Sequence, residues 1–273
     1  MAQWYLFLPQ VRLGVDELTL RACTAEASGF DGVALLDHLR TPMAPASPVW
    51  EAMTLATWIA AKTQRLQIGH LVLCDAFRHS SVLAKQAVTL AEVSGGRFDL
   101  GLGSGSMPDE LADFGFGTAT GRERVAALQR TLEDLSRYWA DQVPAPREPI
   151  PLLLGGRGPR MLELVRRHAD WWNLPATHLD DLPRLMPQIG DARASVQQMV
   201  GFIGAGADAE AVIGKSRRRY AQLGSGLICA RADELIDHFG RLGSQGVQRF
   251  YVWFSDPSPE TIAEFAETVI ARS

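Results

Sequence analysis

The chain has 273 residues, a net charge of −4, and a composition that is 47% hydrophobic and 21% charged. This balance is typical of a soluble globular protein, and the slight acidity excludes a general attraction to nucleic acid or to an anionic membrane. Three widely spaced cysteines (Cys23, Cys74 and Cys229) exclude a disulfide framework and a spaced metal site, and favour a cytoplasmic location.

The first predicted element lies in the opening "MAQWYLFLPQVRL", which is too short in apolar residues to predict a signal peptide. Further short apolar runs recur, each followed by a segment with helical spacing. Continuous apolar runs are typical of parallel strands, because these are buried on both faces. The predicted strands are residues 4–8, 32–36, 66–73, 97–103, 150–155, 170–174, 198–204 and 247–254.

Between these strands the apolar residues step by three and four, as they do along one face of a helix. Examples are Leu83 to Leu90, Val125 to Trp139, and Leu235 to Leu242. Ser258 is suited to cap the last helix. Eight strands alternating with helices over about 250 residues predict a single (β/α)8 TIM barrel over residues 1–273, ahead of a doubly wound open sheet.

Two long loops are predicted, at residues 37–49 and 104–121, after the second and fourth strands. Both would lie at the C-terminal rim, where barrels carry out their chemistry. The second strand ends in "LLDH", which places Asp37 and His38 on this rim. A histidine here can donate a hydrogen bond or carry a proton; the alternative is a histidine that only bonds a loop.

Glycine-rich turns follow the fourth and fifth predicted strands. In "GLGSGS", Gly103 and Gly105 would let the backbone approach a flat ligand or a phosphate. In "GGRGPR", a helix begins near Pro159, and its free amides together with Arg157 would suit an anion. A tight turn between strand and helix is the alternative for both. The run "KSRRRY" (215–220) is predicted to be a solvated helix face.

Five stretches together resemble the bacterial luciferase-like flavin oxidoreductase family. They are residues 26–38, 50–79, 90–110, 152–160 and 169–174. The "GGRGP" turn resembles the subgroup that uses the deazaflavin coenzyme F420 rather than FMN. The resemblance implies a luciferase-like TIM barrel, F420 (or alternatively FMN) at the rim, a small-molecule substrate and a homodimer.

The resemblance also assigns residues to the cofactor. The loop after the fifth strand would hold its phosphate, through Gly155, Gly156, Arg157, Gly158 and Pro159. Related enzymes have a non-proline cis peptide behind the ring, at the position of Leu71–Val72. His38 would lie near the reactive carbon, as the residue that assists proton movement. Further cofactor contacts would come from Asp37, Cys74, Gly103, Ser104, Gly105 and Ser106.

Two features depart from the subgroup's sugar-phosphate and alcohol dehydrogenases. Those dehydrogenases carry a Trp shortly after the Asp-His pair and a Glu at the position of Ser106. This chain has no Trp there, and its acidic residues Asp109 and Glu110 lie nearby at another offset. We therefore expect hydride transfer between F420 and an unidentified small organic substrate. The alternatives are a reduced-FMN monooxygenase, a non-catalytic flavin- or deazaflavin-binding protein, and an unrelated barrel enzyme acting on a phosphorylated sugar.

Overall fold

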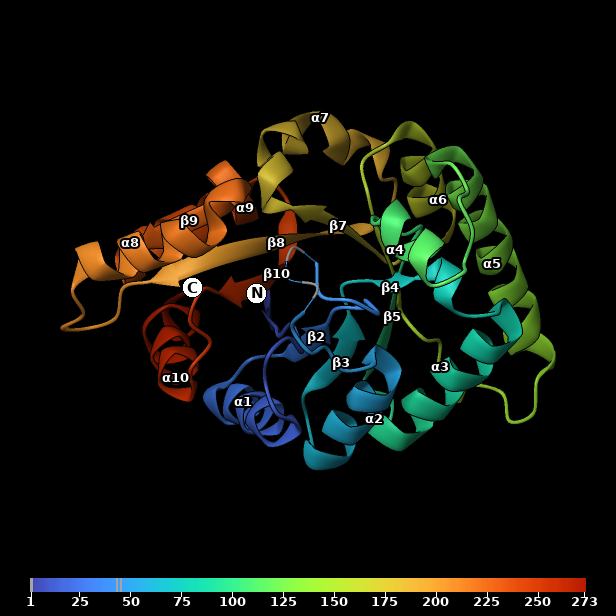
Figure 1. The fold of residues 1–273 in the computed structure, drawn as a ribbon, viewed down its shortest axis with the longest axis horizontal. Helices are drawn as coiled ribbons and strands as arrows, with labels where there is room; N and C mark the ends of the chain where they lie inside the picture. Colours follow the sequence, from blue (N-terminus) through green and yellow to red (C-terminus); the bar gives the residue numbers. More distant parts are fainter. Residues whose placement is uncertain (1, 43, 45) are drawn as a thin grey trace.

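In the computed structural model, which describes residues 2–42, 44 and 46–273, eight parallel strands close into a ring surrounded by helices (Figure 1). The ring runs β1-β2-β3-β5-β6-β7-β8-β10, and pairing of β10 with β1 closes it. The predicted (β/α)8 TIM barrel is therefore confirmed. The strands are β1 (Gln3–Phe7), β2 (Gly32–Leu35), β3 (Gln67–His70), β4 (Leu73–Cys74), β5 (Phe98–Gly103), β6 (Leu152–Gly155), β7 (Trp171–Pro175), β8 (Arg193–Phe202), β9 (Leu227–Ala230) and β10 (Val247–Phe254).

Three strands differ from those predicted. The predicted strand 66–73 is divided into β3 and β4 by Leu71–Val72, whose peptide bond is cis. Strand β8 begins at Arg193 rather than at residue 198, and β9 was not predicted. The start of β8 was missed because the buried Ser195 breaks the apolar pattern there. Strand β9 pairs with β8 outside the ring.

The helices follow the apolar stripes read from the sequence. Leu128, Leu132 and Leu135 are buried along α5, as their spacing predicts. The Ser258 side chain accepts a hydrogen bond from the Thr261 amide and so caps α10 as expected. The α-helices are α1 (Val15–Ser28), α2 (Ala52–Lys62), α3 (Ser80–Ser94), α4 (Pro108–Asp113), α5 (Gly121–Asp141), α6 (Pro159–His168), α7 (Leu182–Leu185), α8 (Ala209–Tyr220), α9 (Ala232–Ser244) and α10 (Pro259–Thr268).

The two long connections lie after β2 and β5. In the first, predicted as a loop over residues 37–49, residues 43 and 45 lie outside the described part of the chain. The second, residues 104–121, contains helix α4, so this segment is not wholly a loop. Proline at the start of α4 suits the first helical turn, where a missing N–H costs no hydrogen bond.

Apolar side chains fill two separate spaces. The larger cluster lies between the strands and the surrounding helices, and includes Trp172. The smaller lies inside the barrel, and includes Tyr5, Trp171 and Tyr251. Neighbouring residues of a strand point to opposite faces, which is why the two tryptophans separate.

At the N-terminal end of the barrel, Arg249 stacks on the rings of Tyr5 and Trp171 and pairs with Asp99 at 2.7 Å. These large groups fill that end, so open space inside the barrel is found towards the C-terminal ends of the strands. Among the described residues, none of the helices combines the length and apolar character needed to cross a membrane.

Candidate functional site

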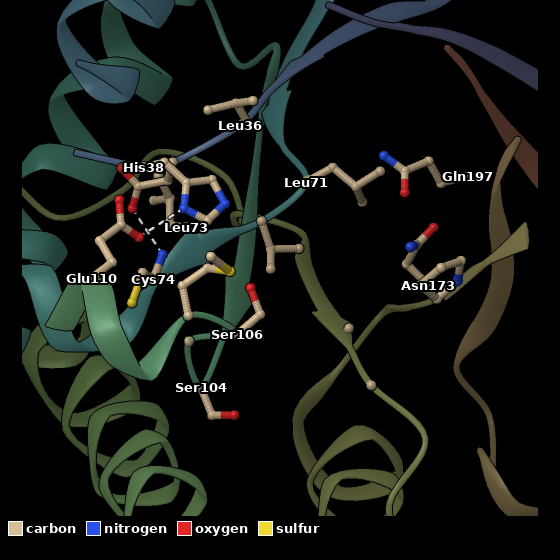
Figure 2. A pocket seen from close by; sticks show the side chains of 18 of the residues that line it. Leu36, His38, Leu71, Leu73, Cys74, Ser104, Ser106, Glu110, Asn173 and Gln197 are labelled. Carbon is tan, nitrogen blue, oxygen red and sulfur yellow. Dashed lines mark hydrogen bonds and ion pairs between the residues drawn. The ribbon is translucent and has the colours of Figure 1, made fainter. Parts of the chain in front are cut away.

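A cavity of about 310 Å³ opens at the C-terminal ends of the strands (Figure 2). Of the fourteen residues predicted for the site, eleven line it, and Arg157, Gly158 and Pro159 do not. These three follow directly after the lining residue Gly156 and are exposed. The lining residues are Leu36, Asp37, His38, Leu71, Val72, Leu73, Cys74, Gly103, Ser104, Gly105, Ser106, Met107, Glu110, Leu111, Gly155, Gly156, Asn173, Pro175 and Gln197.

One wall of the cavity is apolar and is formed by Leu71 and Val72, which join β3 to β4. Glycines on the neighbouring strands leave room for this wall. A Cβ atom at Gly103 would lie 2.7 Å from Val72 Cγ2, which is too close for any side chain. The wall therefore depends on bare backbone at the end of β5.

His38 and Glu110 are hydrogen-bonded to each other at the opposite side of the cavity from Asn173 and Gln197 (Figure 2). His38 Nδ1 lies 2.8 Å from Glu110 Oε2. Because a carboxylate only accepts, Nδ1 carries the proton of this bond, and Nε2 is left to face a ligand. The His38 side chain is 20% exposed, so the ring is reachable from the cavity.

Glu110 is buried, and it fixes the backbone around the histidine as well as the ring. Its Oε1 atom accepts hydrogen bonds from the amides of Leu39 and Arg40, at 2.8 and 2.9 Å. Glu110 was expected near the site, but its contact with His38 could not be predicted from the sequence. That contact forms only because α4 packs against the loop after β2. The Pro-Asp-Glu start of α4 was a signal for that helix.

Asp37 is held by contacts within the protein. Its carboxylate accepts two hydrogen bonds from the Arg78 guanidinium, at 2.6 and 2.9 Å, and one from the Cys74 amide, at 2.8 Å. Arg78 also pairs with Glu51 at 2.6 Å. These bonds tie the end of β2 to β4, so the observed role of Asp37 is to position this corner of the cavity.

Cys74 contributes its side chain to the cavity wall. Burial raises the pKa of its thiol to about 11, so the protonated form dominates at neutral pH. A thiol of this kind is a poor nucleophile, because the thiolate is the reactive form. The raised pKa argues against a nucleophilic role for Cys74, and its contact with the cofactor stays a prediction from the family resemblance.

Two amide side chains that were not predicted as site residues also line the cavity. Asn173 lies in the middle of β7, and its Oδ1 lies 3.1 Å from the Ser195 hydroxyl, whose one hydrogen is shared with the Trp172 carbonyl at 2.9 Å. Gln197 lies on β8 and lines the same side. Asn173 shares a strand face with Trp171, so alternation could have placed it inside the barrel. Gln197 lay outside the predicted strand.

The turn after β6 leads from the cavity to the start of α6. Gly156 has φ of 117°, a conformation that favours glycine, and its carbonyl accepts a hydrogen bond of 2.7 Å from Trp172 Nε1. Helix α6 then begins at Pro159, as predicted, with unpaired amides in its first turn. Arg157 is exposed and lies 3.5 Å from Asp181.

The described residues contain no cluster of three or more His, Cys, Asp or Glu side chains that could hold a metal ion. The cavity instead offers one histidine with a carboxylate bound to it, two amides, an apolar wall and glycine backbone; the Asp37 carboxylate, the Cys74 thiol and the hydroxyls of Ser104 and Ser106 complete the polar lining. Such a set suits a flat ligand with polar edges.

Comparison with known proteins gives three kinds of match. The sequence pattern of the family described as luciferase-like monooxygenase matches residues 9–223. An F420-dependent glucose-6-phosphate dehydrogenase of Nakamurella multipartita is 30% identical over 181 residues, which are 58% of this chain and 52% of that protein. An uncharacterized protein of Mycobacterium tuberculosis is 27% identical over 197 residues, 62% of this chain and 68% of that protein. The chain spans about half the length of the first dehydrogenases that it matches.

Among solved structures, an F420-dependent secondary alcohol dehydrogenase in complex with an F420-acetone adduct superposes with a TM-score of 0.87. It is 16% identical, and the match covers 100% of this chain and 99% of that one. The monooxygenase RslO1 from Streptomyces bottropensis gives a TM-score of 0.82 at 15% identity, with 99% of each chain covered. At these identities the structural matches establish the fold.

Proposed function

Since this chain belongs to the luciferase-like monooxygenase family, we propose that it is an oxidoreductase that transfers a hydride between coenzyme F420 and a small organic substrate. The similarity to F420-dependent glucose-6-phosphate dehydrogenases favours F420 over FMN. The shape of the cavity supports the proposal most directly: an apolar wall at Leu71 and Val72 lies beside bare glycine backbone.

The residues of the cavity fit a tricyclic ring. A flat heterocycle presents two apolar faces and a polar edge; the Leu71–Val72 wall suits one face, and the amides of Asn173 and Gln197 suit the edge. Any side chain at Gly103 would displace Val72 and disturb this wall. The second face of the ring would remain open to the substrate.

We assign the anionic end of the cofactor to the turn after β6, over residues 155–159. Gly155 and Gly156 line the cavity, and the first amides of α6 follow at its exposed edge. Free amides at a helix start attract phosphate, because they donate hydrogen bonds and carry the positive end of the helix dipole. The exposed Arg157 adds a positive charge beside them, with its Nη1 atom 3.5 Å from Asp181 Oδ2.

When bound, F420 would supply the carbon that carries the hydride, while the protein orients the reactants and excludes water. His38 would hold the proton that accompanies this hydride at a substrate oxygen. Glu110 keeps the His38 ring in one tautomer with Nε2 free, which makes this nitrogen the acceptor or donor towards substrate.

Titration of the apoprotein with F420 and, separately, with FMN tests the proposal. Saturable binding of F420 with much weaker binding of FMN supports it. His38→Ala should then lower turnover by about 10²-fold or more while leaving F420 affinity unchanged. His178→Ala, whose side chain is outside the cavity lining, is the matched control. Unchanged turnover in His38→Ala would remove this residue from the mechanism.

The second candidate is a reduced-FMN monooxygenase, which the family's description and the superposition on RslO1 favour. Tight FMN binding without F420 binding would support it. A bound cofactor that never changes redox state with any substrate tested would instead support a non-catalytic binding protein.

We also propose a homodimer and a cytoplasmic location. Helices α1, α2 and α3 carry Leu20, Trp58 and Val82, which are 56%, 43% and 51% exposed and would suit a partner face. Light scattering tests the dimer, and a monomer mass would refute it.

The cytoplasmic location is supported by the three cysteines, which are all unpaired, as expected in a reducing compartment. Cell fractionation tests the location, and recovery outside the cytoplasm would refute it.

A further inference from the structure

A second cavity, of about 400 Å³, lies beside the first. It is enclosed by the segments after β1, β2 and β10 and by the end of α8. Leu36 lines both cavities, and it directly precedes Asp37 and His38. Leu36 is therefore a shared wall, and a molecule in the second cavity would lie next to the proposed cofactor site.

Three arginines line this second cavity: Arg12 after β1, Arg21 on α1, and Arg219 at the end of α8. Arg219 was predicted to be part of a solvated helix face, and it is exposed, but it borders the cavity. Three arginines from separate elements thus border one space.

Arg21 is half-buried, whereas Arg12 and Arg219 are exposed. The Nε and Nη1 atoms of Arg21 are buried, and neither has a hydrogen-bond partner among the described residues. A buried donor without a partner is costly, and guanidinium donors are nearly always satisfied in proteins. Both atoms are out of reach of a water molecule, so a ligand in the open cavity reaches them only if the Arg21 side chain turns towards it.

The charge of this lining is uncompensated within the described part of the chain. The cavity's one carboxylate, Asp256, pairs with Lys215 at 2.8 Å. Arg12 uses Nε to bond the Ser47 hydroxyl at 2.7 Å, which leaves its terminal nitrogens free for a ligand.

The backbone of Arg12 has φ of 63°, which L-residues rarely adopt, and its amide donates a hydrogen bond to the Pro48 carbonyl at 3.0 Å.

The rest of the lining is apolar and aromatic. Trp253 and Tyr220 meet edge to face, with ring centroids 5.6 Å apart, and Val11 and Leu13 also line the cavity. Such a surface accommodates an organic body as well as a charged group. A free inorganic ion would leave this apolar area unused.

We propose that this cavity binds the anionic group of the substrate, so that the substrate is an organic carboxylate or phosphate ester. Its charged group lies among Arg12, Arg21 and Arg219, and its reacting carbon extends past Leu36 towards His38. This inference rests on the proposed function, since it takes the first cavity as the cofactor site. Guanidinium groups suit both anions, because their parallel N–H donors bind two oxygens at once.

Calorimetric titration of the F420-loaded protein with three probes, at constant ionic strength, tests the inference. The probes are inorganic phosphate, benzoate and neutral benzamide. Phosphate or benzoate should bind, and benzamide should bind much more weakly. Arg21→Gln and Arg219→Gln should each weaken anion binding by about 10-fold or more, the loss expected from one charge-assisted hydrogen bond. Arg219 is exposed, so its variant should fold normally.

Arg217→Gln is the matched control, because it removes an exposed charge from the same helix but does not line the cavity. Its anion affinity should stay within about 2-fold of wild type. A preference for phosphate would identify a phosphate ester, and a preference for benzoate a carboxylate; both support the inference.

Three results would overturn it: no anion binding, an equal loss in Arg217→Gln, or a loss of F420 affinity in Arg21→Gln or Arg219→Gln. The last would assign the arginines to the cofactor's own anionic tail. If wild type fails to bind F420, the proposed function fails, and the same titrations on the protein alone decide whether the anion site exists.

Discussion

Replacing Glu110 by alanine should remove three hydrogen bonds from a buried side chain. Glu110 accepts from His38 Nδ1 and from the amides of Leu39 and Arg40, at 2.8 to 2.9 Å. Hydrogen bonds to a charged group contribute about 1.5–3 kcal/mol each, but the two amides are near the surface and regain water. We expect a loss of about 3 kcal/mol in the free energy of unfolding.

Glu110→Gln separates the contributions. The glutamine oxygen can still accept from both amides, whereas its NH₂ group faces the His38 N–H, so one bond is lost and the loss should be about 1–2 kcal/mol. His38 can restore that bond by moving its proton to Nε2, which ¹⁵N chemical shifts of the labelled imidazole detect.

Urea unfolding of both variants measures these losses. Asp109→Asn is the control, because Asp109 is the exposed neighbour in α4; its effect should be about 0.5 kcal/mol or less. The reasoning is refuted if Glu110→Ala destabilises the protein no more than this control, or if wild-type His38 carries its proton on Nε2.

Three further predictions concern the barrel core and the cavity wall. Burial lowers the pKa of His70 to about 4, so the unfolded chain takes up a proton first on acidification; stability should fall by about 3 kcal/mol between pH 6.5 and 4. Urea unfolding should show a smaller fall in His70→Leu, and an identical fall would contradict this origin. The Cys74 thiol, with its pKa raised to about 11, should react slowly with iodoacetamide at pH 8 and faster as the pH approaches 11; fast labelling at pH 8, seen by mass spectrometry, would be the opposite result. Gly103→Ala should cost about 1–3 kcal/mol in urea unfolding, because the new Cβ would lie 2.7 Å from Val72 Cγ2, and adding Val72→Ala should restore part of it. Failure of the second change to help would place the clash elsewhere.

The barrel could be predicted because parallel strands buried on both faces appear as apolar runs. The pattern fails where polar residues are buried. Ser195 is fully buried in the first half of β8, where its hydroxyl donates to the Trp172 carbonyl, and this buried polar residue interrupts the apolar pattern. Strand β9 is short and follows a glycine- and serine-rich stretch that indicates a turn.

The parts of the site that lie within a single loop could be predicted from the sequence. His38 and the two glycine turns lie at strand ends, where barrel geometry and the family resemblance both place the chemistry. The partner of His38 could not be predicted, because Glu110 reaches it only through the fold of α4. The second cavity could not be predicted for the same reason, because its three arginines come from separate elements.

The central claim is that the cavity between His38 and Asn173 holds the ring of F420 against the Leu71–Val72 wall. A crystal structure of the protein soaked with F420 tests this most directly. We expect ring density packed on that wall, with the phosphate of F420 at residues 155–159. Ring density in any other place, or full occupancy by FMN and none by F420 under matched soaking, would contradict it.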